Sequence, residues 1–223
     1  MSRYETLMAR DGHTFSTYIA KPAGKARGGS IIVQEIFGLT DFICRTADRC
    51  AAAGYLTLAP ALFDRVGRDL VLDYSQRDME QGRGLCKQID TAKALLDIAA
   101  AAAVTRHVGR LAVIGFSWGG RLAWAAASEL SFSAAVCYYP MALEQELPKI
   151  PRCPTMLHFG AADQSIPPPE IERVRGAFPQ GIYHVYERAG HAFSNEDRPD
   201  CYNAEAAALA RQRSEAFMAQ YLG

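Results

Sequence analysis

Apolar runs alternate with amphipathic stretches along most of the chain. Six short runs are apolar and rich in β-branched or aromatic residues, as buried strands are: 30–34, 55–59, 111–114, 134–139, 155–159 and 182–186. Between and after them, apolar residues recur at helical spacing over 40–53, 88–103, 122–130, 167–178 and 203–221. This alternation predicts an α/β fold, a mostly parallel twisted sheet flanked by helices.

Two further segments complete the predicted outline. Residues 3–20 alternate loosely around Asp11-Gly12, which predicts an antiparallel hairpin at one edge of the sheet. Residues 60–84 are polar and rich in arginine, and Gly82 and Gly84 interrupt any continuous helical pattern. We expect a long loop there that forms one wall of a substrate pocket. Only residues 140–154 separate two consecutive strands, which leaves no room for a separate lid domain and predicts an open site.

The composition narrows the classes of function. With 223 residues and 49% hydrophobic content, the chain is expected to form one domain over 1–223. Its 24 basic and 24 acidic residues cancel, so no basic surface indicates nucleic acid or an anionic membrane, and a small molecule is the expected partner. Neither a signal peptide core nor a membrane span is evident, and the six cysteines form no Cys-x-x-Cys pair. These features predict a cytoplasmic protein with free thiols.

The sequence Gly115-Phe116-Ser117-Trp118-Gly119 joins a predicted buried strand to a predicted helix. A Gly-x-Ser-x-Gly motif in this context forms a sharp turn that lifts the serine side chain clear of the sheet. A serine that merely caps the helix is the structural alternative. Whether Ser117 is a nucleophile or a helix cap therefore depends on whether a catalytic base and acid are present elsewhere in the chain.

A serine nucleophile needs a positioned base and an acid that orients the base. Of five histidines, His191 follows the last predicted strand within Gly190-His191-Ala192-Phe193, where an open parallel sheet displays its ligand-binding groups. Asp163 follows the preceding strand, although an Asx turn before Pro167 would also explain it. The order Ser117, Asp163, His191 is that of α/β-hydrolases and predicts a catalytic triad.

The chain resembles the dienelactone hydrolase family over nearly its whole length. The resemblance is carried by Gln34-Glu35-Ile36-Phe37-Gly38, Asp78-Met79-Glu80, Gly115 to Arg121, Tyr138-Tyr139, Gly160 to Asp163 with Pro167, and Gly190 to Phe193. It implies an α/β-hydrolase that cleaves small esters or lactones through an acyl-enzyme, with no cofactor and no metal. It also implies an oxyanion hole from the backbone N–H groups of Ile36 and Trp118, and a carboxylate, Glu35, that contacts the nucleophile.

Two positions depart from the family pattern. The family usually carries cysteine where this chain has Ser117, and one sequence does not distinguish a natural serine from an engineered one. Members that act on chlorocatechol-derived substrates carry an arginine at Asn195, where it grips the substrate carboxylate. Arg65, Arg68, Tyr139 and Asn195 are the candidate substrate contacts. A binding protein without turnover and a lipase or peptidase on the same scaffold are the alternative functions.

Overall fold

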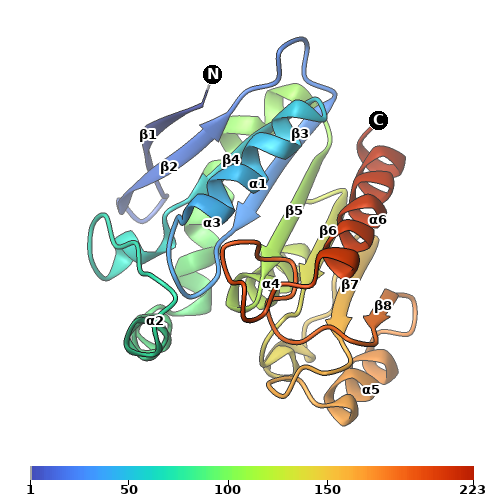
Figure 1. The fold of residues 1–223 in the computed structure, drawn as a ribbon. Helices are drawn as coiled ribbons and strands as arrows, with labels where there is room; N and C mark the ends of the chain where they lie inside the picture. Colours follow the sequence, from blue (N-terminus) through green and yellow to red (C-terminus); the bar gives the residue numbers. More distant parts are fainter. Residues whose placement is uncertain (1) are drawn as a thin grey trace.

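A computed structural model describes residues 2–223. Eight strands form one sheet in the order β1-β2-β4-β3-β5-β6-β7-β8, in which β2 runs antiparallel to both of its neighbours and all other pairs are parallel (Figure 1). This is the α/β-hydrolase fold, as the sequence predicted. The strands are β1 Arg3–Met8, β2 Thr14–Ala20, β3 Gly28–Val33, β4 Tyr55–Pro60, β5 Leu111–Phe116, β6 Ala134–Tyr138, β7 Thr155–Gly160 and β8 Ile182–Tyr186.

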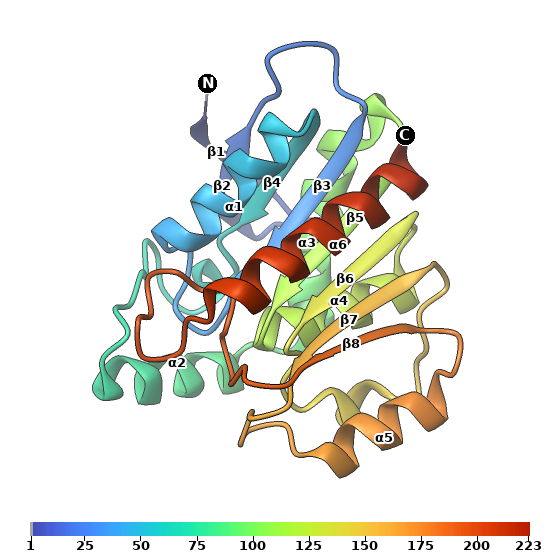
Figure 2. The same cartoon turned by 45° about the vertical axis from the view of Figure 1, so that its right-hand side comes forward.

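Helices cover both faces of the sheet. On one face, α1 packs on β2, β3 and β4, and α6 packs on β5, β6 and β7; on the other, α3 and α4 pack against each other and against the central strands (Figure 2). The helices are α1 Asp41–Ala52, α2 Gln76–Gln88, α3 Thr91–Thr105, α4 Trp118–Glu129, α5 Pro168–Ala177 and α6 Ala204–Leu222, with short 3-10 helices at Leu62–Arg65, Arg106–Val108 and Leu143–Glu146. None of the helices within residues 2–223 is long and apolar enough to span a membrane.

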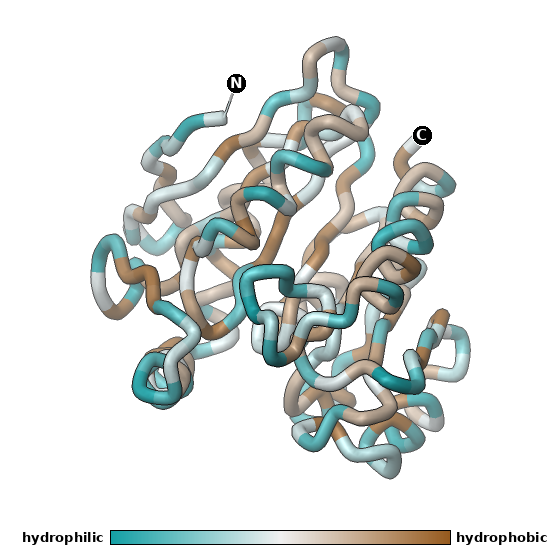
Figure 3. Tube along the Cα trace, viewed as in Figure 1, coloured by the Kyte–Doolittle hydropathy of each residue, from teal (hydrophilic) through white to brown (hydrophobic). Residues whose placement is uncertain are grey.

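The core lies on both faces of the central strands, where the hydrophobic colouring of the chain is strongest (Figure 3). All six residues of β5 are buried, as are all residues of β3, β4, β6 and β7. Because β5 to β8 are parallel and in register, with Phe116 opposite Tyr138 and Gly160 opposite Tyr186, the loops that follow them emerge at the same edge of the sheet. That edge receives the segments that carry Ser117, Asp163 and His191.

Residues 60–84 were expected to form one long loop, which is correct for 66–75 but wrong for 62–65, a 3-10 helix, and for the part from Gln76 onward, where α2 begins. Helix α2 runs through Gly82 and Gly84, and its N-cap Ser75 accepts a hydrogen bond from the backbone N–H of Asp78. A Cβ on Gly82 would lie 2.0 Å from the carbonyl oxygen of Ile36. Glycine at this position therefore allows the helix to lie against the loop after β3, a tertiary requirement that a helix-breaking interpretation of glycine does not anticipate.

Candidate active site

Ser117 occupies a strained turn between β5 and α4. Its φ of 55° and ψ of −115° lie outside the ordinary helical and strand regions. The flanking glycines make the turn sterically possible, because a Cβ on Gly115 would lie 1.9 Å from the carbonyl oxygen of Gly119. A Cβ on Gly119 would lie 2.3 Å from the carbonyl oxygen of Gln34, so this glycine lets the end of β3 approach the start of α4. Such strain persists only where surrounding structure enforces it.

The three predicted triad residues form one continuous chain of hydrogen bonds. Ser117 Oγ lies 2.8 Å from Nε2 of His191, and Nδ1 of His191 lies 2.7 Å from Oδ2 of Asp163. With the proton on Nδ1, the imidazole donates to Asp163 and accepts from the Ser117 hydroxyl. The other oxygen of Asp163 accepts from the backbone N–H of Ser165 at 2.7 Å, so the Asx turn and the contact with His191 coexist.

Asp163 is buried, whereas the side chain of His191 keeps 21% of its surface exposed. The imidazole therefore reaches the solvent side of the site while its orienting carboxylate is shielded from water. Ala192, directly after His191, adopts a φ of 61°, a second strained residue beside the reacting groups. The loop thus fixes the histidine by backbone geometry as well as by its hydrogen bonds.

The proposed oxyanion loop and the elbow lie next to each other. Trp118 is the first residue of α4, and Ile36 follows β3 in the segment that Gly119 allows to approach. Within residues 2–223 neither backbone N–H donates a hydrogen bond to another protein group. The side chain of Gln34 fixes this loop, since its Oε1 accepts from the N–H of Leu62 and its Nε2 donates to the carbonyl oxygen of Glu35. Two backbone donors without a protein partner, on adjacent segments, suit a developing oxyanion.

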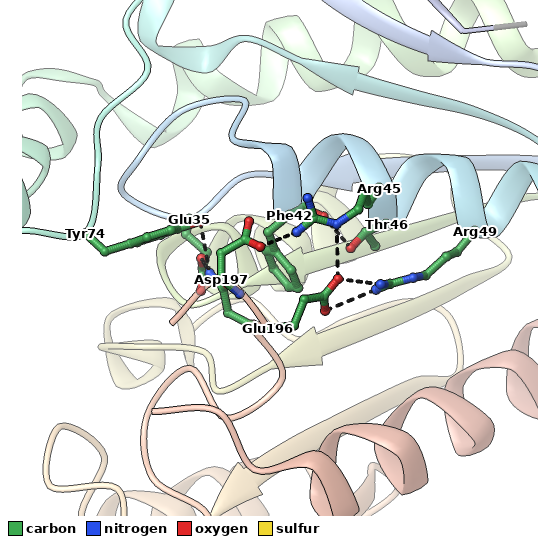
Figure 4. A network of polar contacts seen from close by, with 9 residues as sticks. Glu35, Phe42, Arg45, Thr46, Arg49, Tyr74, Glu196 and Asp197 are labelled. Carbon is green, nitrogen blue, oxygen red and sulfur yellow. Dashed lines mark hydrogen bonds and ion pairs between the residues drawn. The ribbon is translucent and has the colours of Figure 1, made fainter. Parts of the chain in front are cut away.

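Glu35 lies beside the site but does not hydrogen-bond to the nucleophile. Its buried carboxylate accepts from Nδ2 of Asn195 at 2.7 Å, and Nδ2 also lies 3.4 Å from the hydroxyl of Tyr74 (Figure 4). Burial raises the pKa of Glu35, and His191, Asn195 and Arg198 oppose that rise in decreasing order. The carboxylate of Glu35 therefore bonds to Asn195, while the Ser117 hydroxyl bonds to His191.

Replacing the carboxylate of Glu35 with an amide should stabilise the fold at neutral pH. The pKa of Glu35 in the folded state lies above that of an unfolded glutamate, so the folded protein binds more protons between the two values and its free energy of unfolding falls as pH rises through that interval. Glu35→Gln removes the loss in the free energy of unfolding that accompanies ionisation of Glu35. The difference in Tm between the variant and wild type should therefore widen from pH 5 to pH 8. Glu187→Gln, at an exposed position, should leave Tm unchanged, and a gap that narrows with pH would contradict the expectation.

The segment after His191 is tied to α1 by charged groups. Arg45 contacts Glu196 and Asp197, and Arg49 contacts Glu196 (Figure 4). The arginines lower the pKa of Glu196, against the effect of its partial burial. The side chains are 25–40% exposed, so the individual pairs contribute little to stability, but together they restrain the loop that carries His191.

Four residues predicted to contact substrate do not line the pocket. Arg65 is bound by Asp97 and Asp11, and Arg68 pairs with Asp64. Tyr139 is fully buried, with its ring edge packed on His191 and its hydroxyl bonded to Ser194. Asn195 is fully buried against Glu35. Tyr139 and Asn195 therefore contact buried side chains around the site and do not form part of its open surface.

The pocket in front of Ser117 contains two arginines that the sequence did not single out. Arg198 is 8% exposed, lies over the rings of Phe37 and Tyr74 at 5.7 Å, and has no hydrogen-bond partner for Nε within residues 2–223. Arg83 projects from α2, the helix that was predicted as a loop. The lining residues are Glu35, Ile36, Phe37, Met79, Arg83, Ser117, Met141, Ser165, His191 and Arg198.

The two glycines of α2 should respond in opposite ways to alanine. Gly82→Ala places a methyl group against the carbonyl of Ile36 and should shift the loop after β3, which carries the proposed oxyanion donor, lowering kcat by about 100-fold. A Cβ on Gly84 would meet no atom within 4 Å, so Gly84→Ala should raise the free energy of unfolding by about 0.5–1 kcal/mol and leave kcat unchanged. Urea unfolding and steady-state kinetics on both variants test this. Equal kcat values in the two variants would refute the role given to Gly82.

Comparisons of sequence and of structure with known proteins find members of one family and proteins that share the fold. The dienelactone hydrolase family model matches residues 15–222. A carboxymethylenebutenolidase from Pseudomonas putida is 33% identical over 96% of this chain and 94% of its own length, and carboxymethylenebutenolidase 1 from Cupriavidus pinatubonensis is 28% identical over 93% and 92%. A crystal structure of a Klebsiella pneumoniae protein assigned as a dienelactone hydrolase superposes with a TM-score of 0.87 at 28% identity, covering 99% of each chain. The Pyrococcus furiosus esterase Pf2001, at 15% identity and a TM-score of 0.72 over 100% of this chain and 93% of its own, shares the fold.

Proposed function

This chain belongs to the dienelactone hydrolase family and is an ester or lactone hydrolase, and from that premise we propose that it works through an acyl-enzyme on Ser117. The observation that carries the proposal is the unbroken hydrogen-bond chain from Ser117 through His191 to Asp163 at the floor of the pocket. Serine is a weak nucleophile without such a base. The serine is therefore equipped for catalysis although the family usually carries cysteine there.

In the first half-reaction, Oγ of Ser117 attacks the carbonyl carbon of the substrate while its proton passes to Nε2 of His191. Asp163 holds the imidazole by its Nδ1–H and stabilises the positive charge that forms. The carbonyl oxygen becomes negatively charged and accepts from the N–H groups of Ile36 and Trp118. The C–O bond to the leaving oxygen then breaks, and that oxygen takes the proton from Nε2.

In the second half-reaction, His191 accepts a proton from water as the water oxygen attacks the acyl carbon. The tetrahedral intermediate again places its negative oxygen at Ile36 and Trp118, and its collapse returns the proton to Ser117. When the substrate is a lactone, the leaving oxygen stays attached to the acyl group, so one product, a hydroxy or oxo acid, leaves after water attack.

We further propose that the substrate is a small lactone that carries a carboxylate. The relatives' name, carboxymethylenebutenolidase, describes such a compound. The pocket offers Arg83 and Arg198 as cations. Nη2 of Arg198 lies 3.5 Å from Oδ2 of the exposed Asp200, whereas its Nε is a buried donor without a partner within residues 2–223 and could be satisfied by a carboxylate. Asn195 does not take this role because it is enclosed beside Glu35.

The experiment compares ring opening of a carboxymethylene butenolide and of its methyl ester by wild type and Arg198→Gln. Loss of a charge-assisted contact should lower kcat/KM for the acid by about 10- to 100-fold and change that for the methyl ester by less than about threefold. Arg188→Gln, at an exposed position outside the catalytic pocket, is the matched control. Failure of wild type to open either ring would refute the proposed function, and an equal loss on both substrates would refute the carboxylate contact.

A further inference from the structure

A second cavity meets the catalytic pocket at His191. Both cavities are lined by His191 and Ser165, and they share no other lining residue. The catalytic pocket leaves about 40 Å³ for the centres of water molecules, whereas the second cavity leaves about 370 Å³ on the same measure and is open to solvent. A substrate that extends beyond a compact acyl group can therefore continue from the catalytic pocket into this space. We name this space the side cavity.

The walls of the side cavity are bonded to one another. They come from the loops that follow β7 and β8 and from the segment that precedes α6, at 162–165, 188–191 and 200–203. The backbone N–H of Ala162 donates to the carbonyl oxygen of Ala189 at 3.0 Å, which joins the first two segments. Nδ2 of Asn203 donates to the carbonyl oxygen of Arg188 at 3.1 Å, which joins the second to the third. The side cavity is therefore preformed, and a ligand does not have to order its walls.

The hydrolysis of an ester requires room for the leaving group beside His191. When the bond between the acyl carbon and the alcohol oxygen breaks, that oxygen takes the proton from Nε2 of His191. The alcohol part must then lie within hydrogen-bonding distance of the imidazole, while the acyl part is bound to Ser117. The catalytic pocket contains the acyl part, and the side cavity is the space that continues from His191.

Polar side chains predominate in the walls of the side cavity. Gln164, Ser165 and Tyr202 line it and are exposed, so an amide and two hydroxyl groups are accessible to a ligand. Asp200, the one carboxylate among the lining residues, already lies 3.5 Å from Nη2 of Arg198. The ring of Tyr202, 40% exposed, adds an apolar face. A carbon frame that carries several hydroxyl groups can pack on the ring and also exchange hydrogen bonds with the amide and the hydroxyls.

We propose that the side cavity binds the alcohol part of an ester, and that this alcohol carries several hydroxyl groups, as a sugar or a glycerol unit does. The inference rests on the acyl-enzyme proposed for Ser117. It extends the substrates from small lactones, which release no separate alcohol, to esters that join a compact acid to a polyol. After the acyl carbon–oxygen bond has broken and the alcohol oxygen has taken its proton from His191, the polyol leaves through the open side of the cavity, and water takes its place.

The test compares two acetate esters of primary alcohols that are similar in size. 6-O-Acetyl-D-glucose carries hydroxyl groups on its ring, and cyclohexylmethyl acetate carries none. For wild type, kcat/KM divided by the rate constant of alkaline hydrolysis should be at least about tenfold higher for the sugar ester, because its hydroxyl groups pair with the walls. Equal values or a preference for the cyclohexyl ester would overturn the inference. Failure to hydrolyse these two esters and methyl acetate would instead refute the acyl-enzyme on which the inference rests.

Two neighbouring exposed alanines provide a matched pair of variants, because Ala162 lines the side cavity and Ala161 does not. Ala162→Trp should fill the cavity and lower kcat/KM for 6-O-acetyl-D-glucose by at least about tenfold, while that for methyl acetate changes by less than about threefold. Ala161→Trp should change neither value.

A third variant tests the polar wall. Gln164→Met removes the amide and keeps the length of the side chain, so it should reduce the preference for the sugar ester by about three- to tenfold. An equal loss on the sugar ester and on methyl acetate in Ala162→Trp would show that this wall only supports the loop of Asp163, and an unchanged preference in Gln164→Met would show that the wall does not recognise hydroxyl groups. Either result would overturn the inference.

Discussion

Ser117→Ala should lower kcat for ester and lactone hydrolysis by about 10⁴- to 10⁶-fold. The oxygen that forms the acyl bond is lost, and His191 keeps no group on the protein to activate. The measurement is steady-state turnover of a short-chain aryl ester and a butenolide. A second readout is covalent labelling by a fluorophosphonate, which should add one adduct at Ser117 in wild type and none in the variant.

The structure also provides the control for this substitution. Alanine removes one buried oxygen. Because alanine carries a Cβ as serine does, the strain at φ 55° is unchanged, and Tm should change by no more than a few degrees. Ser131→Ala, just beyond α4 at an exposed position, should keep both turnover and labelling. Turnover by Ser117→Ala within tenfold of wild type would show that another group attacks the substrate.

Asp163→Asn should lower kcat by about 10⁴-fold while leaving the fold intact. One carboxylate oxygen accepts from the N–H of Ser165 and the other from Nδ1–H of His191. An asparagine that keeps its carbonyl oxygen on Ser165 turns its amide N–H toward Nδ1. The imidazole must then carry its proton on Nε2, where it cannot accept the proton of Ser117.

This substitution separates the two roles of Asp163. Since the Asx turn needs only an oxygen acceptor, asparagine preserves the turn, and thermal unfolding should match wild type within a few degrees. Asp90→Asn is the matched control, because Asp90 caps α3 through an acceptor oxygen that asparagine also supplies. Wild-type turnover by Asp163→Asn would show that Asp163 serves only to form the turn.

The triad residues could be proposed from the sequence because each one follows a strongly patterned strand. Apolar runs at 111–114, 155–159 and 182–186 mark three parallel strands, and parallel strands present their following loops at one edge. Ser117, Asp163 and His191 are chemically distinctive residues in those loops. Local pattern and topology were sufficient to place them together.

The charged residues that line the pocket in front of Ser117 could be identified only from the tertiary structure. Arg65 and Arg68 were proposed because they lie in a polar segment, yet Arg65 is held by Asp97, 32 residues away in the chain, and Arg68 by Asp64, four residues before it. Arg83 was hidden in a segment taken for a loop, and Arg198 had no motif around it. Charged side chains find partners across the fold, so their sequence neighbours say little about where they point.

Gly82 shows most directly which features follow from the sequence and which follow only from the tertiary structure. The sequence by itself determined the alternation of strands and helices, the elbow at Ser117 and the order of the triad, because these depend on hydrophobic period and local backbone geometry. Only the tertiary structure decided that Gly82 is a contact point of a helix rather than its end, since the atom that excludes a Cβ is the carbonyl oxygen of Ile36, 46 residues away in the chain. Close packing between distant segments leaves no local pattern, and it is this packing that shapes the pocket around Ser117.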